Sequence, residues 1–262
     1  MDQSSSGPSS TEAPRFPVVR SGISLWAPFS WLSQGLSDLH HSPGPSLFYG
    51  FCISALGWLL FVAFRSAIEL AAAAVTGFIL LGPFLGMGLY ELSRRRERNL
   101  PCTLWPTLAI WRRNAAAIGI YSMILIVLYL LWARASMVAF ALFYTGGLLA
   151  MDEFVREIGK AENIEFLVLY VVVGGLFAIL AFAASVVSLP LMLDRGQDAI
   201  TAMLASIVAL SRNAPALLVW AALIAIMVFV GIGLAWVGLI VTMPIVGHAT
   251  WHAYRDLVAD AE

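Results

Sequence analysis

The chain has 262 residues, of which 60% are hydrophobic and 12% are charged. Soluble globular proteins contain about 45–50% apolar and about 25% charged residues, so this chain has too little polar surface to cover its core in water. We therefore predict an integral membrane protein whose main partner is the lipid bilayer. The net charge of −1 excludes the basic surface of a nucleic-acid-binding protein.

The first residues differ from the rest of the chain. Met1–Pro14 contains no bulky apolar residue after Met1, so it has nothing with which to build a core. We predict that residues 1–27 form a disordered cytoplasmic segment and that residues 28–262 form a single all-α membrane domain.

Six segments are long and apolar enough to cross a bilayer, which takes about 20 residues of helix. They are Ser46–Phe64, Ile68–Glu91, Ala115–Trp132, Glu165–Leu191, Ala214–Ile232 and Leu234–His252. We expect the last two to be joined by a sharp turn at Gly231 and Gly233. A shorter apolar run, Ser136–Ala150, contains two glycines, which favours an interfacial or re-entrant piece over a seventh span.

The positions of the basic residues predict the orientation. With six spans and a cytoplasmic N-terminus, four of the 15 Lys and Arg residues lie outside, and the other eleven lie inside. This excess predicts that both termini face the cytoplasm of a bacterial inner membrane. A seventh span at Ser136–Ala150 would worsen the bias only slightly, so charge does not decide between the two topologies.

The chain shows signs of a threefold internal repeat. A short amphipathic stretch precedes the first, third and fifth spans, and the second, fourth and sixth spans each contain a proline towards their inner end: Pro83, Pro190 and Pro244. We therefore predict a polytopic helix bundle made of three units, each an amphipathic elbow helix followed by a two-span hairpin. The units are residues 28–98, 99–200 and 201–262, and the elbows are expected to lie in the cytoplasmic interface.

Aligning the three prolines predicts a cluster of ionisable side chains at the inner ends of the even-numbered spans. Its candidate members are Glu91, Asp194, Asp198, His248 and His252. Ionisable groups at membrane depth are candidates for function, because burying them is costly. The alternative is a polar collar that satisfies helix ends. His248 and His252 also have the spacing of metal ligands, but two imidazoles are a weak signal, and we predict neither a metal nor a cofactor.

A basic run follows the predicted second span, with arginines at positions 94, 95, 96 and 98. Arg94, Arg95, Arg96 and Arg98 are candidates for contact with anionic lipid headgroups, and they serve equally well as a topology signal. The sequence contains no phosphate-binding loop and no nucleophile elbow, and it has almost no soluble portion. We therefore predict that the protein is not an enzyme and has no catalytic residues.

Several motifs resemble those of a known family. They include Trp111-Arg-Arg-Asn, Asp198-Ala-Ile-Thr-Ala-Met and Gly247-His-Ala-Thr-Trp-His-Ala-Tyr-Arg-Asp-Leu, within residues 25–258. The chain is similar in these motifs to bacterial predicted integral membrane proteins with a domain of unknown function. Some members carry the label cytochrome c oxidase subunit. The four histidines of this chain are too few for a catalytic oxidase subunit, so the label implies at most an accessory or assembly role.

Two functional hypotheses remain. In the first, the protein binds or moves a small solute, ion or lipid through the polar cluster on its cytoplasmic side. In the second, it is an accessory or assembly subunit of a respiratory complex of the cytochrome oxidase type, with other membrane subunits as partners.

Overall fold

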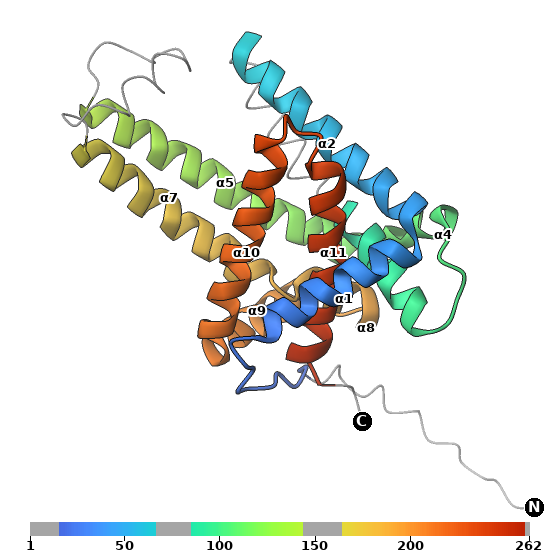
Figure 1. The fold of residues 1–262 in the computed structure, drawn as a ribbon. Helices are drawn as coiled ribbons and strands as arrows, with labels where there is room; N and C mark the ends of the chain where they lie inside the picture. Colours follow the sequence, from blue (N-terminus) through green and yellow to red (C-terminus); the bar gives the residue numbers. More distant parts are fainter. Residues whose placement is uncertain (1–15, 67–84, 144–163, 260–262) are drawn as a thin grey trace, which may run out of the picture.

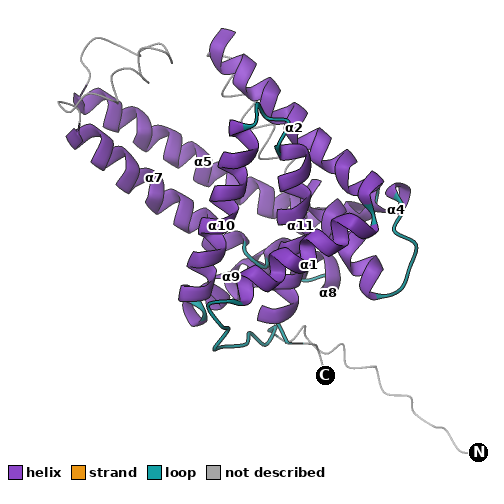
Figure 2. Cartoon of the chain, in the orientation of Figure 1, coloured by secondary structure: helices purple, strands orange, loops and turns teal. Residues whose placement is uncertain are grey.

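The computed structural model describes residues 16–66, 85–143 and 164–259, most of them in helices (Figure 2). These ranges contain no β-sheet, only an isolated bridge between Val19 and Val258. Besides a helix at residues 85–97, the elements are α1 (Ala27–His41), α2 (Pro43–Ser66), α4 (Leu104–Leu108), the 3₁₀ helix η1 (Ile110–Asn114), α5 (Ala115–Phe143), α7 (Ile164–Ser185), α8 (Ser188–Arg195), α9 (Ala199–Arg212), α10 (Ala214–Gly233) and α11 (Leu239–Leu257).

Four stretches of the described chain are long and apolar enough to cross a membrane. They match the predicted first, third, fourth and fifth spans: Pro43–Ala63, Leu104–Phe143, Ile164–Arg195 and Ala214–Gly233. The predicted second span falls largely outside the described residues. The predicted sixth span corresponds to α11, which is not among the four. The fold is therefore an all-helical membrane fold with four candidate spans in its described part.

Helix α11 lies at the centre of one half of the molecule, with α1 crossing it and α2 and α10 beside it (Figure 1). Glycine allows the closest approach. A methyl group at Gly50 of α2 would lie 2.0 Å from the main-chain oxygen of Ile240. Large aromatic side chains fill the remaining core, and Trp31 of α1 meets Trp220 of α10 edge to face at 5.8 Å.

The turn between α10 and α11 differs from the prediction. Helix α10 continues through Gly233, and the chain reverses at residues 234–238, where Ala235 and Trp236 have positive φ angles. Gly231 has a different use. A side chain there would meet Leu239 at 2.4 Å, so this glycine permits close packing of the two helices. The expected turn at Gly231 and Gly233 was wrong because a glycine can serve helix contact as well as chain reversal.

Helices α5 and α7 pair with each other and slant away from α10 and α11 (Figure 1). Helix α5 does not stop at Trp132, where the predicted third span ended, but runs on to Phe143. Residues 136–143, the described part of the Ser136–Ala150 run, therefore extend α5. The rest of that run lies outside the described residues.

Residues 16–27 are the described part of the predicted disordered segment; they end in the first residue of α1 and are bonded to the end of α11. Arg20 donates its main-chain N–H to the oxygen of Leu257 at 2.8 Å, and Ala259 donates to Val18 at 2.9 Å. Val19 between them is buried. Residues 1–15 lie outside the described residues.

Candidate functional site

His248 lies at the junction of four helices. It is fully buried on α11, where one turn separates it from His252 on the same helix face. Its Nε2 is hydrogen-bonded to the hydroxyl of Ser46 on α2 at 2.9 Å, and its Nδ1 to the hydroxyl of Ser93, in the helix at 85–97, at 2.8 Å. Both ring nitrogens are therefore satisfied inside the protein.

Asp38 of α1 connects the two histidines. Its carboxylate accepts hydrogen bonds from Ser93 and Arg96, and it is hydrogen-bonded to Nε2 of His252 at 2.9 Å. Burial by itself would raise the pKa of Asp38, but the bonds from His252 and Ser93 and the nearby imidazoles outweigh it and lower the pKa to about 2. Asp38 is therefore an ionised carboxylate at neutral pH.

We call this set of side chains the Asp38 network; its members are Asp38, Ser46, Ser93, Arg96, His248 and His252. It reaches the surface on one side. The side chains of His252 and Glu97 are 13% and 33% exposed, and a carboxylate oxygen of Glu97 lies 4.0 Å from His252 Nδ1. At the other end, Ser46 meets the buried hydroxyl of Ser42 at 3.3 Å. A chain of polar contacts thus runs from the surface to the buried N-terminal end of α2.

The structure separates the five residues that were predicted to cluster. His248 and His252 belong to the Asp38 network. Glu91 instead pairs with Arg94 at 2.7 Å and with Arg95 at 3.6 Å, three and four residues further along its own helix.

The other two predicted members also lie elsewhere. Asp194 of α8 accepts a hydrogen bond from the phenol of Tyr254 at 3.0 Å and pairs with Arg98 at 3.1 Å. Asp198 is the N-cap of α9, where it accepts from the main-chain N–H of Thr201, and this bond lowers its pKa.

The predicted lipid-contact arginines are all engaged in internal bonds. Beyond the pairs of Arg94 and Arg98 with acids, Arg95 donates to the main-chain oxygen of Pro101 at 2.7 Å. Arg96 bonds Asp38 and also donates to Ser37 at 2.9 Å. Arg96 and Arg98 thus reach side chains of α1 and α8, while Arg94 and Arg95 bond groups near their own helix, and both are structural uses of the run.

Three members of the network were not predicted from the sequence: Asp38, Ser46 and Ser93. A signal for Asp38 was present, because Trp31, Gly35 and Asp38 follow helical spacing and form the buried face of α1. His40 and His41, the neighbouring histidines, are exposed. Ser46 and Ser93 carry no comparable signal.

The chemistry open to the network is limited by its burial. Among the described residues no group of three or more His, Cys, Asp or Glu side chains is arranged to hold a metal ion. Ser46 and His248 have the spacing of a nucleophile and its base, but both are fully buried, so a substrate cannot reach them. The arrangement suits the holding or passing of a proton along hydrogen-bonded groups.

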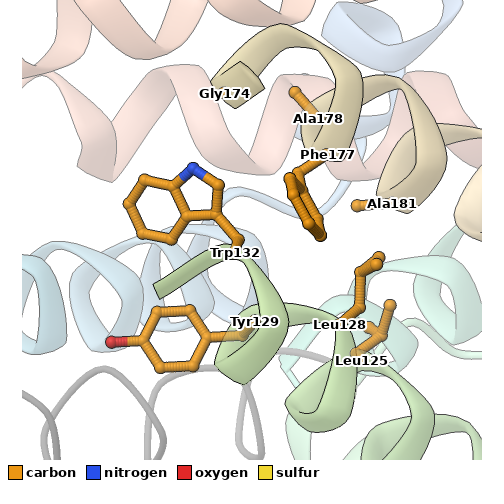
Figure 3. Close-up of a pocket in the computed structure, with 8 residues that line it drawn as sticks. All are labelled: Leu125, Leu128, Tyr129, Trp132, Gly174, Phe177, Ala178 and Ala181. Carbon is orange, nitrogen blue, oxygen red and sulfur yellow. The ribbon is translucent and has the colours of Figure 1, made fainter. Parts of the chain in front are cut away.

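A second feature is an apolar groove between α5 and α7, with a volume of about 380 Å³. Large side chains of α5, including Trp132, line one side, and Phe177 lines the other with the small residues Gly174, Ala178 and Ala181 of α7 (Figure 3). Two hydrogen bonds join the helices beyond its two ends: Tyr121 to Ser185 at 2.8 Å and Ser136 to Tyr170 at 3.1 Å. The groove lies within two candidate spans, so lipid chains can reach it.

Comparison with known proteins agrees with the apolar helices. Residues 70–194, a little under half of the chain, match a family described as predicted integral membrane protein (DUF2189). The chain is an integral membrane protein. The match confirms the resemblance to a family of predicted integral membrane proteins over these residues, which include the motif at Trp111 but not those at Asp198 and Gly247; its description names no oxidase. No curated protein and no solved structure matches the chain.

Proposed function

We propose that the protein crosses a bacterial inner membrane six times, as three elbow-plus-hairpin units with both termini in the cytoplasm. The elbows support this arrangement, because α1 and α9 directly precede candidate spans and α4–η1 forms the start of the apolar stretch Leu104–Phe143, ahead of α5. Reporter fusions near Thr103 and near Ala202 test it. Both reporters are expected on the cytoplasmic side, and reporters on opposite faces would contradict the repeat.

Within that topology, the proposed activity is non-enzymatic: the protein binds or moves a small ligand at its cytoplasmic side through the Asp38 network. The observation that carries this proposal is the buried His248, bonded on both nitrogens within a chain of contacts that begins at the partly exposed His252. Buried ionisable groups of membrane proteins commonly mark proton and ion pathways.

Of the ligand classes considered, solute, ion or lipid, an ion fits best, and the ion is a proton. The donors and acceptors of the network already bond one another. A solute or a lipid headgroup would have to displace these bonds, and each buried group left unsatisfied would cost about 1–3 kcal/mol. A proton joins such a network without needing any space.

Proton movement into proteoliposomes tests the proposal. With an imposed membrane potential and an enclosed pH-sensitive dye, the full chain is expected to acidify the vesicles faster than empty liposomes. Asp38→Asn and His252→Gln should bring the rate to background. Asp198→Asn is the matched control, because asparagine also caps helices well and residue 198 lies outside the network.

A histidine titration separates binding from transport. In nanodiscs, the ring ¹⁵N signals of His248 should shift with pH, and Asp38→Asn should change that shift. If the histidine titrates but no proton flux is measured, the protein binds protons without moving them. Silence in both experiments would overturn the proposal.

The accessory respiratory role stays a second proposal, supported by the groove of α5 and α7. An apolar groove within candidate spans is a surface on which a neighbouring subunit's helix can pack. Native purification in mild detergent tests this role. Co-migration with haem proteins would support it, and a solitary haem-free species would contradict it.

A further inference from the structure

The elbow formed by α4 and η1 has two distinct faces. Its inward face is fixed to the protein at three positions. Thr107 is bonded to the phenol of Tyr49 at 2.8 Å, and Ile110 is buried. Asn114 donates to the main-chain oxygens of Met192 and Gln197 at 3.2 and 2.8 Å.

The outward face carries large apolar and basic side chains. Trp105 is 81% exposed and Leu108 is 38% exposed on α4, and Arg112 of η1 is exposed as well. Arg112 lies over the ring of Trp111 at 5.5 Å. Arg113 beside it is also exposed, and neither arginine forms an ion pair with another side chain of the described ranges.

The exposed Arg112 and Arg113 differ from the basic run at 94–98, whose guanidinium groups form bonds within the protein. Exposed tryptophan, leucine and arginine on one face are typical of a helix that lies in the plane of a bilayer. The elbow is the first part of the apolar stretch Leu104–Phe143 and leads directly into α5, which keeps it at the membrane surface.

We propose that this elbow binds anionic phospholipid, through a lipid anchor made of Trp105, Leu108, Arg112 and Arg113. The guanidinium groups bind the headgroup phosphate, for which arginine has a matching fork of donors. The apolar side chains lie at the boundary with the acyl chains. The inference concerns a surface apart from the Asp38 network and does not depend on proton binding.

Native mass spectrometry of the full chain, purified with mixed phosphatidylglycerol and phosphatidylcholine, tests the anchor. The wild type is expected to retain phosphatidylglycerol preferentially. Arg112→Gln/Arg113→Gln should lose that preference, and Arg112→Lys/Arg113→Lys should keep part of it. Arg134→Gln, which removes an exposed arginine further along α5, is the control and should behave as the wild type.

The position of the Trp105 ring relative to the lipids gives an independent test of the anchor. Brominated lipids should quench the fluorescence of the wild type more than that of Trp105→Phe, and the difference reports Trp105. Unchanged phosphatidylglycerol retention in the double glutamine variant would overturn headgroup binding. Equal quenching in the wild type and Trp105→Phe would overturn the in-plane placement.

Discussion

The two halves of the described molecule share lipid as their solvent but differ in how tightly their helices pack. Around α11, four helices enclose buried aromatic rings, close glycine contacts and the Asp38 network. The hairpin of α5 and α7 is mostly exposed, contains a groove and is joined by two hydrogen bonds. The comparison shows that apolar length places a helix in a membrane, whereas polar contacts and small residues determine which helices it packs against.

The largest effect is expected where α2 touches α11. Gly50→Ala places a methyl group 2.0 Å from a main-chain oxygen that no side-chain rotation can move away. We expect a loss of about 3 kcal/mol in the free energy of unfolding, at the upper end of overpacking effects. Gly175→Ala in α7 is the matched control, because its methyl group would meet no atom within 4 Å. Equal stability of the two variants in detergent micelles would contradict the contrast between the halves.

Removing the central carboxylate is expected to have the next largest effect. Asp38→Asn replaces a charged acceptor by a neutral amide in front of Arg96 and His252. We expect the free energy of unfolding to fall by about 2–3 kcal/mol, because Arg96 and His252 lose the negative charge that they face inside the protein. The partial exposure of Arg96 limits the effect. Thermal unfolding in micelles measures it, and an unchanged midpoint would show that the network adds no stability.

Acid should weaken the α11 half through the same residue. The pKa of Asp38 is lowered from 3.8 to about 2 in the folded protein. The stability that it adds is therefore fully present above about pH 4 and is lost as the pH falls towards 2, by about 2 kcal/mol in all. Acid unfolding curves of the wild type and Asp38→Asn should converge across that window, and parallel curves would argue against an ionised Asp38.

The smallest effect is expected in the hairpin. Tyr121→Phe removes the hydrogen bond to Ser185 and keeps the ring that packs at the base of α5. We expect a loss of about 1 kcal/mol, the usual net value of one such bond. Disulfide trapping between cysteines introduced at positions 125 and 181 reports the separation of the helices. A loss as large as that of Asp38→Asn would mean that the hairpin is not loosely joined.

Helical class and the positions of four spans could be predicted because both follow from local composition. About 20 apolar residues suffice to cross the hydrocarbon, whatever lies beside them. The arrangement of the polar residues was harder. His248 and His252 were correctly placed on one helix face, but Asp194 and Asp198 were grouped with them by alignment of prolines alone. In the structure Asp194 bonds Tyr254, and Asp198 caps its own helix.

The amino-acid sequence determined by itself that lipid is the solvent of this chain and that helices are its regular structure, because both depend on how much apolar surface a local segment carries. Only the tertiary structure decided which charges meet. Asp38 and His252 lie 214 positions apart in the chain, and their contact depends on α1 crossing α11. That crossing is set by the shape of packed side chains, which hydropathy does not record.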